Sequence, residues 1–190
     1  MEAYLSFVKK LVDAFESEGL EYAFTGALAV SFYGVPRTTT DVDIIVALSN
    51  KTDAKSKIAA ALRRAGLQAD ERIIETALTS GYSIASFRGK KTLYSVDIIL
   101  FRGKLERISG KINGVKTFFQ SPKDLINAKL RMIKATLPPE RAIKDKEDVK
   151  AILAFTKVDI EAVKKQALKD KTFEIFQAIT RQKADKTNNP

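Results

Sequence analysis

The sequence predicts an α/β (α+β) protein with a mixed sheet flanked by helices over residues 1–120, a basic helical portion over 121–182 and a frayed tail over 183–190. Three observations support this fold class. The stretch from Asp41 to Leu48 is rich in Val and Ile and apolar on both faces, which is typical of a strand inside a covered sheet. Two further strand-like stretches flank the turn sequence Arg88-Gly89-Lys90-Lys91. Beyond residue 120, apolar residues recur at helical spacing.

The elements of the first part follow from hydrophobic periodicity and from Gly, Pro and Asn punctuation. Helices are expected over residues 2–18, 27–33, 51–65 and 71–78. Strands are expected over residues 20–24, 41–48, 82–87 and 92–101. Gly19, Gly34 and Gly66 stand where the first three helices should end, because Gly readily adopts the left-handed backbone that closes a helix.

Near the end of the first part, Asn113-Gly114 is a strong signal for a tight hairpin turn, and the helical second part begins at residue 121. Ser121-Pro122-Lys123-Asp124 then combines a Ser N-cap, Pro at the first helical position and an acid in the first turn. The helix that it opens should reach about residue 133, and Pro138-Pro139 separates it from the next one. Further helices are expected over residues 140–155, 160–168 and 173–179.

Composition restricts the possible chemistry. The 190 residues include no Cys and no His, which excludes disulfides, thiolate catalysis, His general bases and Cys/His zinc sites. Any catalysis must therefore use carboxylates, Lys, Arg, hydroxyl groups or hard metals bound through oxygen. No apolar run is longer than that from Ile44 to Leu48, which is far shorter than the roughly 20 residues that span a bilayer. With no signal peptide visible, a cytoplasmic protein without a membrane partner is expected.

Charge is unevenly distributed along the chain. The 33 basic and 23 acidic residues give a net charge of 33 − 23 = +10, all of which falls in residues 102–190. A basic half beside a neutral half favours an acidic partner such as nucleic acid or a polyphosphate. The alternative interpretation is a Lys-rich solvated surface.

Three aspartates stand where charge is costly. Asp41 and Asp43 lie two apart at the start of one strand, so both point to one face, roughly 7 Å apart. Asp97 interrupts another mostly apolar strand. If the strands are neighbours, the three carboxylates converge on a site for Mg²⁺ or Mn²⁺, which suits two-metal phosphoryl chemistry. The alternative is that Asp41 lies in water at the strand edge and Asp43 pairs with an Arg.

Other residues extend this hypothesis toward phosphate binding. Thr25-Gly26 precedes a helix, so free backbone N–H groups lie where an anion could bind, and Arg37 could contact a phosphate. The alternative for Gly26 is a simple turn. Lys129 lies on the apolar face of its helix, where it either extends to water or reaches a phosphate. Asp148 is an accessory candidate, although Lys144 offers it an ordinary helix ion pair.

The combination resembles a known family. Thr25-Gly26-Ala27 through Tyr33-Gly34 and Arg37-Thr38-Thr39-Thr40-Asp41-Val42-Asp43 resembles the signature of the DNA polymerase β-like nucleotidyltransferase superfamily. Within it, the spacing is similar to that of AbiEii/AbiGii-type toxins. Ser121-Pro122-Lys123-Asp124-Leu125 with Lys129, and Lys144-Asp145-x-x-Asp148, are similar to helical motifs of that group. The resemblance covers about residues 20–155.

The resemblance implies a nucleotidyltransferase core. It implies Asp41, Asp43 and Asp97 as metal ligands and catalytic residues, and Gly26 with Ala27 as contacts to the triphosphate. Arg37, Thr39 and Lys129 are further candidates for nucleotide binding. Many members have Gly-Ser or Gly-Gly where this chain has Gly26-Ala27, so a hydroxyl contact to phosphate is missing while the backbone amide remains.

We therefore expect a Mg²⁺- or Mn²⁺-dependent nucleotidyltransferase that moves a nucleoside monophosphate from a nucleoside triphosphate to a hydroxyl acceptor. The acceptor is left open between an RNA or tRNA end, a protein hydroxyl and a small molecule, with the basic half favouring RNA. A toxin-like enzyme restrained by an antitoxin protein is a further hypothesis. The alternative from a different class is a catalytically inert nucleotidyltransferase-fold module that binds nucleic acid.

Overall fold

The computed structural model describes residues 2–37, 39–48, 51–80, 83–89 and 93–184. The chain divides into two compact units. The first contains residues 1–29 and 37–120, and the second contains residues 30–36 and 121–190. Residues 30–36, which follow the first strand, thus belong to the helical unit, which their place in the sequence did not indicate.

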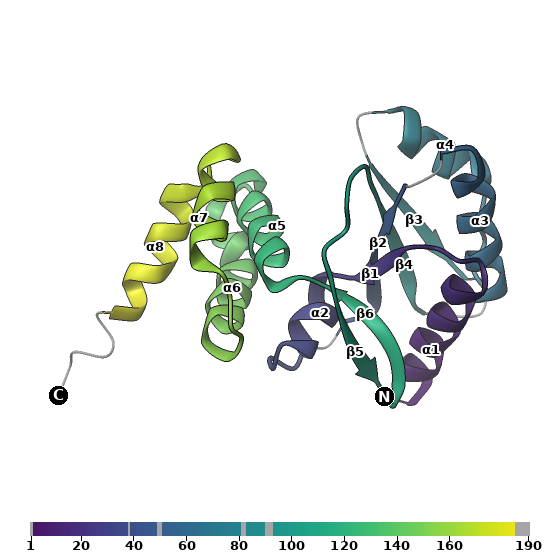
Figure 1. The fold of residues 1–190 in the computed structure, drawn as a ribbon, viewed down its shortest axis with the longest axis horizontal. Helices are drawn as coiled ribbons and strands as arrows, with labels where there is room; N and C mark the ends of the chain where they lie inside the picture. Colours follow the sequence, from purple (N-terminus) through teal and green to yellow (C-terminus); the bar gives the residue numbers. More distant parts are fainter. Residues whose placement is uncertain (1, 38, 49–50, 81–82, 90–92, 185–190) are drawn as a thin grey trace. The chain divides into compact units, whose positions relative to one another are not determined.

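The first unit is built on a six-stranded mixed sheet with the strand order β3-β4-β2-β1-β6-β5 (Figure 1). Its strands are β1 (Tyr22–Phe24), β2 (Asp41–Ala47), β3 (Ile84–Arg88), β4 (Ser95–Phe101), β5 (Arg107–Ile112) and β6 (Val115–Gln120). Its helices are α1 (Glu2–Ser17), α3 (Lys51–Arg64), α4 (Glu71–Thr79) and the start of α2 (Gly26–Phe32). The pairs β2–β4 and β1–β6 are parallel, and the other pairs are antiparallel.

The main core lies between the sheet and the helices on one side of it. Helices α1, α3 and α4 lie together on that side (Figure 1). Alternate residues of the central strands are fully buried there, including Val42 and Ile44 of β2 and Val96 and Ile98 of β4. Burial of a Val or Ile side chain contributes about 1.5–3 kcal/mol each, so these residues fix which face the intervening polar residues occupy. A smaller apolar cluster centred on Ile45 includes residues of the other face.

The second unit is helical. It contains α5 (Pro122–Ala135), a 3₁₀ turn (Pro139–Ala142), α6 (Ile143–Phe155), α7 (Ile160–Lys169) and α8 (Phe173–Ala184). Its apolar core includes Leu130, Val149, Ile152, Val163 and Phe176, all buried. No helix within the described ranges has the length and apolar content required to cross a membrane.

The structure confirms the α/β (α+β) class, and most expected elements lie within a few residues of their predicted ends. The expected helix over 140–155 begins instead with a 3₁₀ turn over Pro139–Ala142, a common start for a helix, and the regular helix begins at Ile143. The last helix extends to Ala184, so residues 183 and 184 are helical rather than frayed. The remaining tail, Lys90-Lys91 of the predicted turn, and residues 82 and 92, each the first of a predicted strand, lie outside the described residues.

Candidate functional site

The strand register brings the three aspartates to one face of the sheet. β2 and β4 run parallel, with Asp41 opposite Ser95 and Asp43 opposite Asp97. Because side chains alternate along a strand, Asp41 and Asp43 share the face that Asp97 occupies on the adjacent strand. Neighbouring strands lie about 4.8 Å apart, so the backbones carrying Asp43 and Asp97 are direct neighbours. Asp41 is exposed, whereas Asp43 and Asp97 are partly buried.

Hydrogen bonds hold the start of β2. The Ser95 hydroxyl donates to Oδ1 of Asp41, and the Ser95 backbone N–H donates to the Thr40 carbonyl across 3.2 Å. Thr39 Oγ1 accepts from the Asp41 N–H at 3.1 Å and donates to the Asp41 carbonyl at 3.0 Å. Thr39, expected to contact nucleotide, thus has a structural task in positioning Asp41. Ser95 was not a candidate on sequence grounds, since a strand Ser carries no motif signal.

Gly26 lies against Asp43. β1 runs antiparallel to β2, and the Thr25 N–H donates to the Asp43 carbonyl at 3.0 Å, which brings the start of α2 to Asp43. A Cβ built on Gly26 would lie only 1.9 Å from Asp43 Oδ2. Gly26 also has φ of +56°, a left-handed conformation that side chains disfavour. Position 26 therefore requires Gly for two independent reasons, its left-handed backbone and the lack of room beside Asp43. A simple turn would explain only the left-handed backbone.

Two further candidates, Ala27 and Arg37, follow Gly26 in the sequence. Ala27 is the second residue of α2 and is partly buried. Arg37 is partly buried and precedes β2 by a few residues, with Thr38 between it and Thr39 outside the described part of the chain. Thr25 is buried, and its hydroxyl donates to Gln120 Oε1 at 2.5 Å, which links the end of β1 to the end of β6.

The residues of this face suit a hard divalent cation by their chemistry. Carboxylate oxygens are the ligands that Mg²⁺ and Mn²⁺ prefer. The absence of a side chain at Gly26 keeps space beside Asp43 Oδ2 that a Cβ would fill. Within the described residues, however, no three carboxylates converge closely enough to form a finished metal cluster. Asp41, Asp43 and Asp97 would hold a cation only if their side chains turn toward one another.

Lys129 and Asp148 lie in the helical unit. The Lys129 ammonium contacts Asp145 at 2.7 Å and Asp148 at 2.8 Å, with 14% of the Lys129 side chain and 4% of the Asp148 side chain exposed. Burial alone would lower the pKa of Lys129, but the hydrogen bonds and charges of the two carboxylates outweigh it and raise that pKa. Lys129 therefore does not simply extend to water. Its role as a phosphate ligand remains a prediction.

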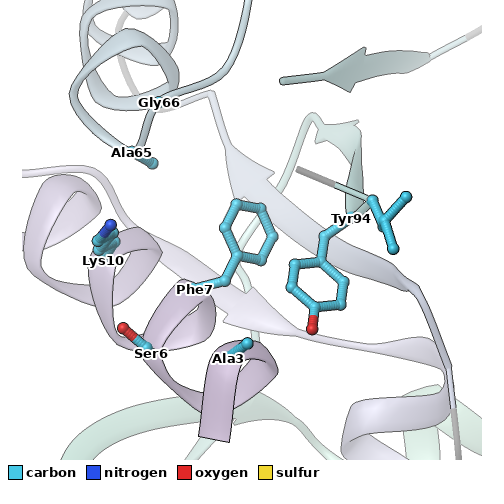
Figure 2. Close-up of a pocket in the computed structure, with 8 residues that line it drawn as sticks. Ala3, Ser6, Phe7, Lys10, Ala65, Gly66 and Tyr94 are labelled. Atoms are coloured by element: carbon cyan, nitrogen blue, oxygen red, sulfur yellow. The ribbon is translucent and has the colours of Figure 1, made fainter. Parts of the chain in front are cut away.

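The first unit also contains a cavity of about 520 Å³ next to the start of β4. Figure 2 shows the rings of Phe7 and Tyr94 side by side at its wall, with Lys10 and Ala65 across from them. The two rings are stacked with centroids 5.3 Å apart. Tyr94 directly precedes Ser95, whose hydroxyl donates to Asp41, but Ser95 itself does not line the cavity.

Comparison with known proteins gives a fold and no family. No protein-family model matches the chain, and no curated protein matches it significantly. The solution structure of the antibiotic-resistance factor ANT(2″)-Ia matches with a TM-score of 0.68 at 12% identity, covering 97% of this chain and 98% of that one. The crystal structure of ANT(2″)-Ia with adenylyl-2″-tobramycin matches with a TM-score of 0.65 at 13% identity, covering 90% and 98%.

A third solved structure is an antigenic nucleotidyltransferase-like protein from Paracoccidioides brasiliensis. It matches with a TM-score of 0.57 at 16% identity, covering 92% of this chain and 91% of that one. The similarity spans nearly the whole chain in all three cases. The protein therefore has the fold of these nucleotidyltransferase structures.

Proposed function

We propose that the protein is a divalent-metal-dependent nucleotidyltransferase that moves a nucleoside monophosphate from a nucleoside triphosphate to a hydroxyl group. The observation that carries this proposal is the register of β2 and β4, in which Asp43 lies directly opposite Asp97 on the face shared with Asp41. The nucleotidyltransferase fold of the matching structures supports it.

Each residue of the face has a separate task in this proposal. Asp41 and Asp43 would hold Mg²⁺ or Mn²⁺, and Asp97 would share a cation and accept the proton of the acceptor hydroxyl. A divalent cation there supplies positive charge for the triphosphate and lowers the pKa of the attacking hydroxyl, so that no His is needed. The backbone N–H groups of Gly26 and Ala27, together with Arg37, would contact phosphate oxygens. Lys129 is a further candidate for phosphate contact.

The reaction balances as an in-line substitution. The acceptor oxygen forms a bond to the α-phosphorus, and the bond from that phosphorus to the bridging oxygen of the β-phosphate breaks. Pyrophosphate leaves with the electron pair, and Asp97 takes the hydroxyl proton. Fixed cationic groups and amides stabilise the charge that develops on the phosphates, which is where such sites obtain most of their rate.

RNA is the acceptor that the charges favour most. The net charge of +10 lies entirely in residues 102–190. In the helical unit, Lys123, Lys165 and Lys169 line a cavity of about 190 Å³ between α5 and α7, together with Asp124, whose carboxylate lies 3.9 Å from the Lys123 ammonium. Three ammonium groups against one carboxylate leave an excess of positive charge there, which favours an anion such as RNA phosphate. The resemblance to AbiEii/AbiGii-type toxins adds the hypothesis that an antitoxin protein restrains the enzyme.

The experiment is to incubate the protein with Mg²⁺, each α-labelled nucleoside triphosphate in turn, and total RNA. The label should enter RNA in a Mg²⁺-dependent reaction, with pyrophosphate as the second product. Label on the protein itself would redirect the acceptor to a protein hydroxyl. An inert nucleic-acid-binding module, the alternative that the lysine cavity supports, would bind RNA in a salt-sensitive way and transfer no label.

A further inference from the structure

The β5–β6 hairpin carries all its basic side chains on one face. Residues 107–120 include three basic residues, Arg107, Lys111 and Lys116, and no acidic residue. Arg107 and Lys111 are four positions apart on β5, so they point the same way, and Lys116 of β6 lies directly opposite Lys111. Both lysines are exposed. Like charges directly opposite each other on neighbouring strands destabilise a sheet, so this pair calls for an explanation.

This face of the hairpin is the face that carries the candidate acids. Phe118 follows Lys116 by two residues on β6, so the two side chains share a face. Phe118 packs against the apolar cluster that contains Ile45. Ile45 follows Asp43 by two residues on β2, so these two also share a face. The basic residues of the hairpin and the three candidate aspartates therefore lie on the same side of the sheet.

Arg107 lies in the same row of the sheet as Asp43. Arg107 is opposite Gln120, and Gln120 Oε1 accepts from the Thr25 hydroxyl. The Thr25 N–H in turn donates to the Asp43 carbonyl. Three strand spacings of about 4.8 Å separate β5 from β2, so the two backbones are about 14 Å apart. Successive phosphates of a stacked strand are about 3.4 Å apart along the axis, so about four nucleotides cover this distance.

The Arg107 guanidinium is held as a flat cationic surface. Its central carbon lies 3.8 Å from the centroid of the Phe118 ring, and its Nη1 donates to the Tyr22 carbonyl at 3.2 Å. Arg107 is partly buried and does not extend freely into water. A guanidinium plane held in this way can stack against a nucleobase.

Protection of the sheet edge explains only part of this pattern. β5 is an edge strand, and Lys residues on an edge strand hinder pairing with other chains. Lys116, however, lies on β6, which pairs with β1 on one side and β5 on the other. Arg107 reaches inward, over Phe118 to the backbone of β1. A face that binds a polyanion accounts for all three basic residues.

We propose that the β5–β6 hairpin binds the acceptor RNA as a single strand, with Lys111 and Lys116 on its phosphates and Arg107 stacked on a base nearer the candidate acids. The inference rests on the proposed function and goes further, because it assigns the acceptor a surface on the first unit. An RNA phosphate between the two lysines offsets the repulsion that their register creates.

The test compares two double variants that lose the same charge, Lys111→Gln/Lys116→Gln and Lys10→Gln/Lys57→Gln. Lys10 and Lys57 are exposed on α1 and α3, on the other side of the sheet. With a single-stranded RNA oligonucleotide, the slope of log K against log salt should decrease by about 1.4 in the hairpin variant, or 0.7 for each lost phosphate contact. The control should keep the parent's slope. Equal slopes in the two double variants would overturn the inference.

Arg107→Lys tests the stacking separately, because it keeps the charge and removes the planar group. It should bind the oligonucleotide about tenfold more weakly than the parent, with the parent's salt slope. Affinity equal to that of the parent would overturn the stacking role of Arg107.

The second readout is Mg²⁺-dependent transfer of labelled nucleotide to RNA. Lys111→Gln/Lys116→Gln should raise the KM for RNA about tenfold and leave kcat unchanged, as expected for contacts far from the reacting atoms. The KM for the nucleoside triphosphate should stay at the parent's value. An unchanged KM for RNA overturns the inference alone, and so does label that enters protein in place of RNA. No transfer by the parent overturns the proposed function, and the inference with it.

Discussion

Gly26 and Asp43 are in direct contact, and the contact leaves no room for a side chain at position 26. A Cβ there would lie 1.9 Å from Oδ2 of Asp43, far inside the closest approach of two such atoms. The glycine of the Thr25-Gly26 sequence therefore shapes the space around the carboxylate itself. This ties the two halves of the sequence signature, the glycine turn and the Asp-x-Asp strand, to a single point of the fold.

Replacing Gly26 with Ala should disable the site by displacing the Asp43 carboxylate. Gly19→Ala is the matched control, because Gly19 has a similar φ of +63° while nothing lies within 4 Å of its Cβ position. Both variants carry the strain of a left-handed side chain, about 1–2 kcal/mol. Only Gly26→Ala should also weaken binding of Mn²⁺ with nucleoside triphosphate, measured by calorimetry. Equal binding by the two variants would show that the Gly26–Asp43 contact has no role in the site.

Removing the Lys129 ammonium from its buried cluster with Asp145 and Asp148 should lower the free energy of unfolding. Lys129→Met leaves Asp145 and Asp148 without the ammonium that both contact. Breaking a buried pair from one side costs about 3 kcal/mol, which should be visible in urea unfolding. Lys164→Met is the control, since its pair with the 82%-exposed Glu161 should contribute less than about 1 kcal/mol. Comparable losses in both variants would refute a special role for the cluster.

The same cluster predicts a pH dependence at the alkaline end. The folded protein raises the pKa of Lys129 above its ordinary 10.5, so the folded state keeps this proton to higher pH than the unfolded state does. The stabilisation is then fully present below the unfolded pKa and is lost as pH rises through the folded pKa. The stability difference between the parent and Lys129→Met should be constant from pH 7 to 9 and shrink above pH 10.5. A difference that instead grows with rising pH would contradict this sign.

RNA binding should depend on the lysine cavity of the helical unit. The double variant Lys165→Gln/Lys169→Gln removes two of its three ammonium groups. Its affinity for a single-stranded RNA oligonucleotide should fall, and the slope of log K against log salt should decrease by about 1.4, or 0.7 for each lost phosphate contact. Lys164→Gln lies on the same helix outside the cavity and should keep the parent's slope. A matching loss in that control would mean that only net charge matters.

Local features of the fold could be predicted because their causes are local. Asn113 and Gly114 have φ of 47° and 82°, the left-handed pair that a tight hairpin needs, and they join β5 to β6 as expected. Ser121 caps α5, with its hydroxyl accepting from the Asp124 N–H at 3.2 Å. Each of these signals depends on two to four neighbouring residues.

Contacts between residues that are far apart in the sequence could be predicted only conditionally, because they depend on which elements are neighbours in the fold. That Asp97 would meet Asp43 depended on β2 and β4 being neighbours, and 54 positions separate the two residues in the sequence. The sequence did not predict that Lys129 pairs with Asp145 and Asp148. Lys129 lies on α5 and both acids lie on α6, and no short motif fixes the geometry of the turn between these helices.

The central claim is that Asp43 and Asp97 act in one site, and a double-mutant cycle on nucleotide transfer tests it most directly. The initial rate of Mg²⁺-dependent label transfer would be measured for the parent, Asp43→Asn, Asp97→Asn and the double variant. If both carboxylates serve one centre, each single variant should lose at least 100-fold, by analogy with other catalytic groups, and the double variant little more. Transfer by Asp97→Asn at the parent's rate, or losses that simply multiply in the double variant, would contradict the claim.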